Sequence, residues 1–170
     1  MFVGTKGPTG IEKVVLGMNA ADIIENSTVT VITVPENARL NGLHRIVYAT
    51  DLSDINRELD FILPIAKLFD AWIYAVHIVD SSSESDVETA QMTKTLISTF
   101  NYSKIKVERV VSDTVPSGII EFAANVDGDL LVMFTHRLGF IEKIFGQGIT
   151  RAIAFQTQIP LFSFNKNHFY

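Results

Sequence analysis

From residue 44 onward the chain alternates short apolar runs with longer amphipathic segments. The short runs have the pattern of buried strands, and the longer segments repeat apolar residues every three to four positions, as helices do. Predicted strands cover residues 46–49, 71–79, 105–111, 130–134 and 159–164, and predicted helices cover 54–69, 85–100, 116–126 and 141–155. Because strict alternation with short connections favours right-handed crossovers, we expect an α/β fold with a doubly wound, five-stranded parallel sheet.

Two residues bear on the first predicted helix. Ser53 is the expected N-cap, since its hydroxyl can accept a hydrogen bond from the first turn. Pro64 lies inside the helix, where proline costs about 3 kcal/mol. We therefore expect a kink at Pro64 or a first turn that is only loosely helical.

The first forty residues repeat the end of the chain. At an offset of 130 positions and without a gap, residues 11–13 (Ile-Glu-Lys) align with an identical 141–143, and residues 31–34 align with 161–164. The alternative is a chance similarity between two amphipathic helices. The matched strand, helix and strand favour a repeat, so residues 1–40 are predicted to be the C-terminal strand-helix-strand remnant of a preceding repeat, and residues 41–170 a complete domain.

Composition narrows the function classes. The chain is 47% hydrophobic, which supports a packed core, and its net charge of −5 lacks the basic footprint of a nucleic-acid partner. The absence of cysteine excludes a disulfide framework, a thiolate metal site and a cysteine nucleophile, and suits a reducing, cytoplasmic location. No uncharged stretch reaches the roughly 18 residues of a membrane span, and the first ten residues lack a signal-peptide pattern, so we expect no membrane partner.

Glycines follow the first short apolar run of the chain. Gly4, Gly7 and Gly17 have the spacing G-x2-G-x9-G between a predicted strand and a predicted helix. Backbone N–H groups without side chains can approach phosphates there, and the helix N-terminus favours their negative charge. The alternative is that these glycines serve the geometry of turns.

These motifs resemble those of the universal stress protein family, whose nucleotide-binding members carry G-x2-G-x9-G-[S/T] at the fourth strand and an Asp after the first strand. The segment Asp51-Leu52-Ser53 is similar to the acidic loop, and residues 129–133 are similar to the strand before the glycine loop. The resemblance implies an adenine nucleotide alpha hydrolase-like sheet with strand order 3-2-1-4-5, in which Asp51 helps to hold the adenosine part. The first repeat departs at one position, where Met18 replaces the hydroxyl residue.

The complete domain departs from the family motif throughout the loop. In an ungapped alignment Phe134, Arg137 and Gln147 replace the three glycines, and Gly148 replaces the serine or threonine. The side chains of Phe134 and Arg137 then occupy the space in which the backbone of a glycine loop would contact the phosphates of a nucleotide. We expect no cofactor in this chain, with ATP or AMP bound only in a full-length parent. Arg137 could contact an anion, although a solvated loop arginine or an ion pair is the alternative.

Candidate catalytic and metal-binding residues are few. No two histidines have metal-ligand spacing, and no serine has the surroundings of a nucleophile elbow, so we expect neither a metal site nor catalytic residues. His77 is expected to be a packed or hydrogen-bonded imidazole, and His136 falls in the loop of the complete domain. For Asp51 the alternative is a structural role, as an acidic residue that shapes a turn and binds no ligand.

The remnant contributes a β-branched strand without a sheet of its own, from Val29 to Val34. Because an exposed edge of this kind promotes aggregation, it needs a partner. In the family, last strands commonly pair antiparallel across a pseudo-twofold axis. The resemblance therefore implies that this strand lies beside the strand from Ile159 to Phe164, in the same chain or a swapped neighbour, and we expect a homodimer.

The sequence as a whole indicates a universal stress protein of the tandem type, a non-catalytic stress-response and interaction module. One alternative is an ATP- or AMP-binding stress protein, or a nucleotide sensor, that uses the glycine loop of the first repeat together with Asp51. Another is an unrelated flavodoxin-like domain. That fold needs a phosphate-binding loop after the first strand, and residues 50–55 lack its glycines and hydroxyls.

Overall fold

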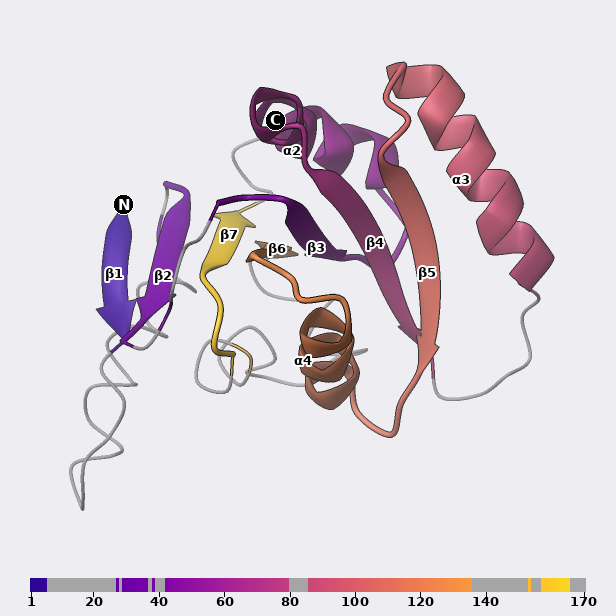
Figure 1. Ribbon diagram of the computed structural model, residues 1–170. Helices are drawn as coiled ribbons and strands as arrows, with labels where there is room; N and C mark the ends of the chain where they lie inside the picture. Colours follow the sequence, from indigo (N-terminus) through magenta and orange to yellow (C-terminus); the bar gives the residue numbers. More distant parts are fainter. Residues whose placement is uncertain are drawn as a thin grey trace. The chain divides into compact units, whose positions relative to one another are not determined.

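The computed structural model describes residues 1–5, 27, 29–36, 38, 42–79, 86–135, 153 and 157–165 (Figure 1). The chain is α/β, as predicted, and divides into two compact units. One unit is Asn41–Asp129, and the other combines Met1–Leu40 with Leu130–Tyr170.

The unit Asn41–Asp129 alternates strands and helices in the predicted order. Its elements are β3 (Arg45–Ala49), α2 (Ile55–Phe69), β4 (Trp72–Val79), α3 (Asp86–Phe100), β5 (Ile105–Val111) and α4 (Val115–Asn125). The three strands are parallel, with Ile46 opposite Ile73 and Ile73 opposite Ile105. They therefore follow the order β3-β4-β5, which is the part 3-2-1 of the expected order.

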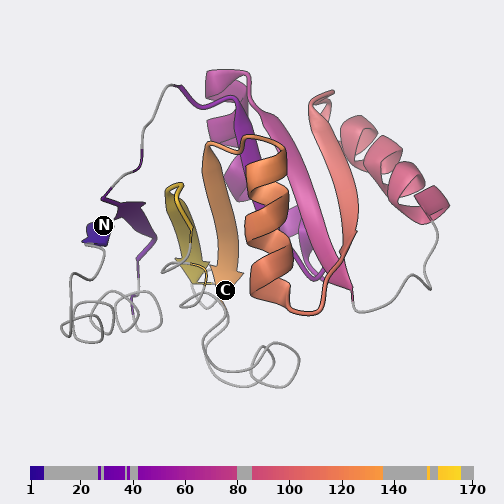
Figure 2. The ribbon, with the colours of Figure 1, turned by 60° about the horizontal axis from the view of Figure 1, so that its bottom comes forward.

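Helices α2 and α4 cover opposite faces of these strands (Figure 2). Tyr48 on β3 contacts Glu58 on α2, and the ring of Tyr74 on β4 meets Phe122 on α4 edge to face, with 6.1 Å between ring centroids. Tyr74 pairs with Val47, and successive strand residues point to opposite faces, so Tyr48 and Tyr74 face different layers. This is the layered arrangement that the sequence predicts.

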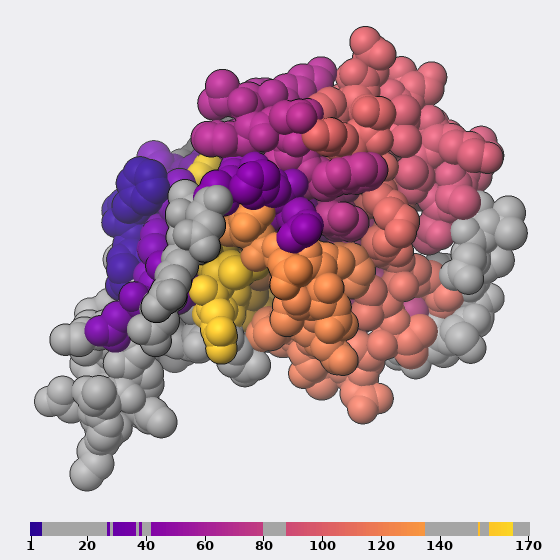
Figure 3. Space-filling model, in the orientation of Figure 1, coloured from indigo at the N-terminus to yellow at the C-terminus, as the bar shows by residue number. Residues whose placement is uncertain are grey.

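Helix α3 runs along β5, the last strand of the order (Figure 1). The Val107 N–H donates a hydrogen bond of 2.9 Å to Oγ1 of Thr93 on α3. A strand at a sheet edge leaves alternate backbone donors without a ladder partner, and this bond satisfies one of them. The outer side of α3 forms part of the molecular surface (Figure 3).

In the other unit, the described residues form strands β1 (Phe2–Thr5), β2 (Val31–Pro35), β6 (Leu130–Thr135) and β7 (Leu161–Asn165). Their order is β1-β2-β7-β6. The pairs β1–β2 and β6–β7 are parallel, and β2–β7 is antiparallel. The strand from Val29 to Val34 was expected beside the strand from Ile159 to Phe164, and this pairing is made within the chain, between residues 31–33 and 161–163.

Both units have buried apolar residues on their strands, and the first also has them on α2. Residues with almost no exposed surface are Ile46, Tyr48, Leu59, Ile62, Ile73 and Ile105 in the first unit, and Val31, Leu131, Ile153 and Leu161 in the second. The outer side of α2 instead exposes Leu68, at 78% of its surface. None of the helices that the structure describes is both long and apolar enough to cross a membrane.

The start of α2 corrects one prediction. The N-cap is Asp54, not Ser53, because the Ser53 hydroxyl donates 2.6 Å to Oδ1 of Asp51 and so belongs to the preceding loop. The loosely helical first turn is absent, since the Glu58 N–H donates to the Asp54 carbonyl at 3.1 Å. The helix continues past Pro64, which is exposed. The predicted helix over 141–155 lies outside the described residues, apart from Ile153, and so does the helical part of the predicted remnant, within residues 6–26.

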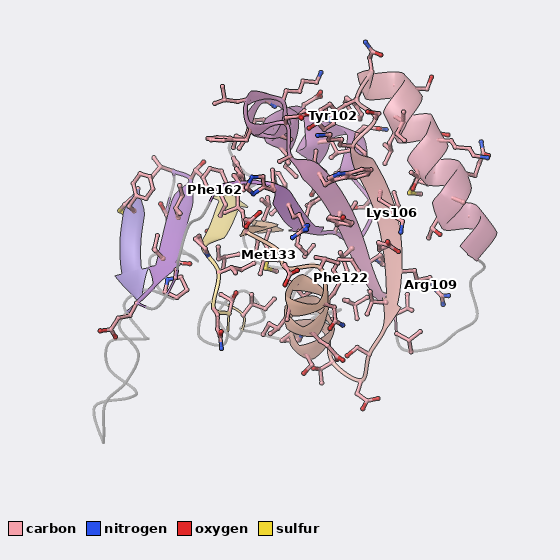
Figure 4. The ribbon with its side chains drawn as sticks, in the orientation of Figure 1. Tyr102, Lys106, Arg109, Phe122, Met133 and Phe162 are labelled. Atoms are coloured by element: carbon pink, nitrogen blue, oxygen red, sulfur yellow. The ribbon has the colours of Figure 1, made fainter. Side chains whose placement is uncertain are left out.

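Tyr102 closes the other end of α2 (Figure 4). Its hydroxyl donates to the carbonyl oxygens of Ala71, at 2.6 Å, and Ala66, at 3.1 Å. Asp70 ends the helix in the left-handed conformation, with φ of 53°. Burial, and then the nearby charge of Asp70, raise the pKa of the Tyr102 phenol above 10.0, so the neutral hydroxyl is favoured in the fold.

Candidate functional site

The acidic loop, residues 50–54, connects the carboxyl end of β3 to α2. Oδ1 of Asp51 accepts hydrogen bonds from the backbone N–H of Ser53, at 2.9 Å, and from its hydroxyl, at 2.6 Å. Between them Leu52 has a φ of 67°, a conformation uncommon for residues other than glycine. The carboxylate therefore shapes the turn through its Oδ1 atom.

Thr50 anchors this loop to β4 through its main chain. Its N–H donates to the Val76 carbonyl at 3.0 Å, and its carbonyl oxygen lies 3.0 Å from Nδ1 of His77, which requires a proton on that nitrogen. Its Oγ1 accepts a hydrogen bond of 2.9 Å from the Leu52 N–H. His77 is thus the packed, hydrogen-bonded imidazole that the sequence predicts.

Beneath the loop lies a buried carboxylate that the sequence reasoning missed. Glu58 on α2 is only 3% exposed, and the Tyr48 hydroxyl donates a hydrogen bond to its Oε2. The same hydroxyl lies 2.9 Å from Oγ1 of Thr50. A buried carboxylate requires such donors, because leaving water without them is costly. An acidic residue within the apolar stripe of Ile55, Leu59 and Ile62 was the available signal.

The Tyr48–Thr50–Glu58 cluster therefore fixes the acidic loop from below. Tyr48 comes from β3 and Glu58 from the first turn of α2, so the cluster joins the strand and helix on either side of the loop. Thr50 contacts β4 through its main chain and Tyr48 through its hydroxyl, so the next residue, Asp51, is kept in a defined position. Such preorganisation is what a ligand-binding or partner-binding loop needs.

The positions that the repeat aligns at the ends of β1 and β6 differ in side chain. Phe134 on β6 is 7% exposed, and its ring stacks on that of Phe164 with centroids 4.9 Å apart. Gly4 on β1 stands in the same place in its own strand, and a β-carbon there would meet nothing within 4 Å. The position at the end of β6 is therefore filled by the ring of Phe134, whereas the corresponding position on β1, at Gly4, is open.

Several candidate residues lie outside the described residues. These are Gly7, Gly17, Met18, His136, Arg137, Gln147 and Gly148. Within the part of the chain that the structure describes, no three histidine, aspartate or glutamate side chains are grouped so as to hold a metal ion.

A family model described as the universal stress protein family matches residues 42–162. Among solved structures, the chain is similar to a universal stress protein from Archaeoglobus fulgidus DSM 4304, with TM-score 0.74 and 17% identity over 96% of this chain. It spans 60% of the length of that protein.

Two further solved structures share the fold. One is a universal stress protein in complex with cAMP, with TM-score 0.57 and 19% identity, and it covers 73% of this chain and 98% of its own. The other is a protein of the same family from Burkholderia pseudomallei, with TM-score 0.50 and 15% identity, and it covers 71% of this chain and 94% of its own. No curated protein matches the sequence. Because the family model covers well over half of the residues, the chain belongs to the universal stress protein family.

Proposed function

We propose that this chain is a stress-response module of the universal stress protein family that acts in the cytoplasm through contact with a partner, without catalysing a reaction. The observation that carries the proposal is the ring of Phe134. It stands at the first glycine position of the family motif and is buried against Phe164. A phosphate held by main chain needs that position bare.

The domain organisation proposed here is tandem: residues 1–40 end one repeat and residues 41–170 form the next. Strand registers support it. Phe2, Val3, Gly4 and Thr5 pair with Ile32, Thr33, Val34 and Pro35, and Val132, Met133, Phe134 and Thr135 pair with Phe162, Ser163, Phe164 and Asn165. Every residue of the second set is 130 positions after its counterpart in the first, which is the offset of the sequence repeat. Two unrelated strand pairs have no reason to share one register.

A second function, binding of ATP or AMP by the glycine loop of the first repeat, has one observation in its favour. Gly4 is open, with nothing within 4 Å of a β-carbon built there, whereas its counterpart Phe134 is filled. A solved structure with the same fold is a complex with cAMP, which is a property of that protein. In this chain such a site would use Gly4, Gly7 and Gly17, the glycine loop of the first repeat.

Titration calorimetry of the full chain with ATP and Mg²⁺ tests the two functions against each other. We expect no stoichiometric binding and no release of phosphate. A micromolar dissociation constant that Asp51→Ala abolishes would overturn the contact-based function.

The matched variant for the second function is Gly4→Val. A β-carbon at Gly4 would meet nothing within 4 Å, and valine favours strands, so we expect the strand to stay intact while the bare backbone is lost. Nucleotide binding by the wild type that Gly4→Val removes would establish the site of the first repeat.

A further inference from the structure

Helix α2 has apolar residues on its outward face as well as on the face that packs against the strands. Its buried apolar residues are Ile55, Leu59, Ile62, Leu63 and Ala66. With about 3.6 residues per turn, Phe61, Pro64 and Leu68 lie on the opposite side of the helix. Phe61 is 40% exposed, Leu68 is 78% exposed, and Pro64 is exposed too. These three residues are called the outer stripe.

The outer stripe has the spacing with which one helix packs against another. Its residues are separated by three and then four positions, so they form a single row along two turns of α2. Single exposed apolar residues are common on protein surfaces, whereas a row of them with polar residues beside it marks an interaction site. Because the row is narrow, it fits one helix of a partner better than a broad surface.

Two charged residues lie on one side of the outer stripe. Asp60 and Lys67 are both exposed, and each directly precedes a residue of the stripe. They are seven positions apart, too far to pair within one helix, where residues three or four apart are neighbours. Among the described residues neither has an ion-pair partner. Lys67 Nζ donates to the Phe100 carbonyl at 3.3 Å, which leaves its charge without a carboxylate.

This arrangement of charges is complementary to itself when two copies of α2 run antiparallel. Asp60 and Lys67 occupy equal positions one heptad apart, and in an antiparallel pair such positions beside the contact row face each other. Asp60 of each copy would therefore face Lys67 of the other. A parallel pair would bring Asp60 beside Ile65 of the other copy instead. An interface between two copies that repeats each contact in this way is isologous.

We infer that the outer stripe is a docking surface for α2 of a second copy of this chain, with the two helices antiparallel. Phe61 of one copy packs against Pro64 of the other, and two ion pairs form between Asp60 and Lys67. The inference goes beyond the proposed contact-based function, and it holds whether or not the chain binds nucleotide.

The dimer is expected to be weak. The outer stripe and its neighbours bury on the order of 400 Å² per copy, about half of the area that a stable complex buries. Contacts of this size are typical of transient complexes, so we expect a monomer at about 1 μM and association near about 100 μM. Sedimentation equilibrium over this range measures the association constant. A wild type that is still a monomer at about 1 mM overturns the inference.

Charge reversal tests the pairing of Asp60 with Lys67. Each substitution acts twice in a symmetric dimer, so Asp60→Lys and Lys67→Glu should each weaken the association about tenfold. The double variant Asp60→Lys/Lys67→Glu restores both ion pairs with the charges exchanged, and it should associate as the wild type does. A folded double variant that associates no better than the single variants overturns the inference.

Mixing the two single variants gives an independent measurement. In the mixed dimer one copy is positive at both positions and the other is negative at both, so all contacts between Asp60 and Lys67 positions are attractive. The mixture should therefore associate more strongly than either variant alone, by about tenfold at low salt. Equal association of the mixture and of the separate variants contradicts an antiparallel pair of α2 helices.

Leu68→Glu tests the apolar row itself. Because Leu68 is exposed, the variant should fold as the wild type does by circular dichroism, while its association falls by about a hundredfold. Glu121→Lys is the matched control for Asp60→Lys, since it makes the same change of charge at an exposed residue of α4, which covers the opposite face of the strands (Figure 2). Unchanged association in Leu68→Glu, or equal losses in Glu121→Lys and Asp60→Lys, overturns the inference.

Discussion

Two buried polar clusters among the described residues are built over very different distances in the sequence. In the unit Asn41–Asp129, Tyr48 and Glu58 are ten residues apart and fix the loop between them. In the other unit, the hydroxyls of Thr33 and Ser163 reach carbonyl groups 128 and 132 residues away. The first cluster shapes a local feature, the acidic loop. The second joins strands from the two ends of the chain.

The largest expected effect comes from the apolar core around β7. Leu161 is fully buried, so Leu161→Ala should lower the free energy of unfolding by about 3 kcal/mol, through lost burial and the cavity left behind. Leu68→Ala is the matched control, because Leu68 is 78% exposed and its loss should cost less than about 0.5 kcal/mol. Urea unfolding measures both. Equal costs would mean that Leu161 is not buried in solution.

The second largest loss of stability is expected in the Tyr48–Thr50–Glu58 cluster. Tyr48→Phe removes the hydroxyl that donates to the buried carboxylate of Glu58, and we expect a loss of about 2 kcal/mol. Hydrogen exchange at the Leu52 amide should also accelerate, because its acceptor Thr50 loses a neighbour. Glu121→Gln, an exposed change on α4, is the control. Unchanged exchange at Leu52 would show that the cluster does not hold the loop.

The two hydroxyls that bridge β2 and β7 should have matched, smaller effects. Thr33→Val and Ser163→Ala each remove one hydrogen bond across β2 and β7, and each should cost about 1 kcal/mol. Because the two bonds are reciprocal and both hydroxyls are buried, the two costs should agree within about 0.5 kcal/mol. Chemical unfolding of the single and double variants measures this. A large effect at one position and none at the other would contradict this reciprocity.

The smallest effect is expected at Tyr102, and it depends on pH. The folded protein raises the phenol pKa above 10.0, so the stabilisation is present below pH 10 and is lost as the pH rises through the folded value. Tyr102→Phe should therefore cost less than about 1 kcal/mol at pH 8, and the difference from wild type should shrink as the pH rises above 10. A difference that stays constant over this range would show that the phenol is not perturbed.

Much of the fold could be read from the sequence because apolar periodicity is a local property. The limits of β5 are the predicted ones, residues 105–111, and other described elements begin or end within a few residues of their expected positions. The prediction that Ser53 caps α2 was wrong because its hydroxyl had two possible partners, the first turn of the helix and the carboxylate of Asp51. In the structure the hydroxyl donates to Asp51. Propensity cannot tell which of two nearby polar partners a serine chooses.

The candidate site was predictable only in part. Asp51 stands in a loop of the expected kind, after a buried strand, and His77 is hydrogen-bonded as expected. Glu58 was overlooked, since a single acidic residue at the start of a helix is usually read as solvated. Its role becomes visible only when Tyr48 is placed opposite it across the packed layers.

By itself, the sequence determined the order of the described strands and helices and the family, because these follow from local patterns and motifs, and it predicted the offset of 130 between the two ends of the chain. The tertiary structure decided that β2 pairs with β7 within the chain, with Ile32 opposite Phe162 and two hydroxyls buried in reciprocal bonds. A register between strands about 130 residues apart depends on which backbone donors and apolar surfaces meet, and no local pattern encodes that meeting.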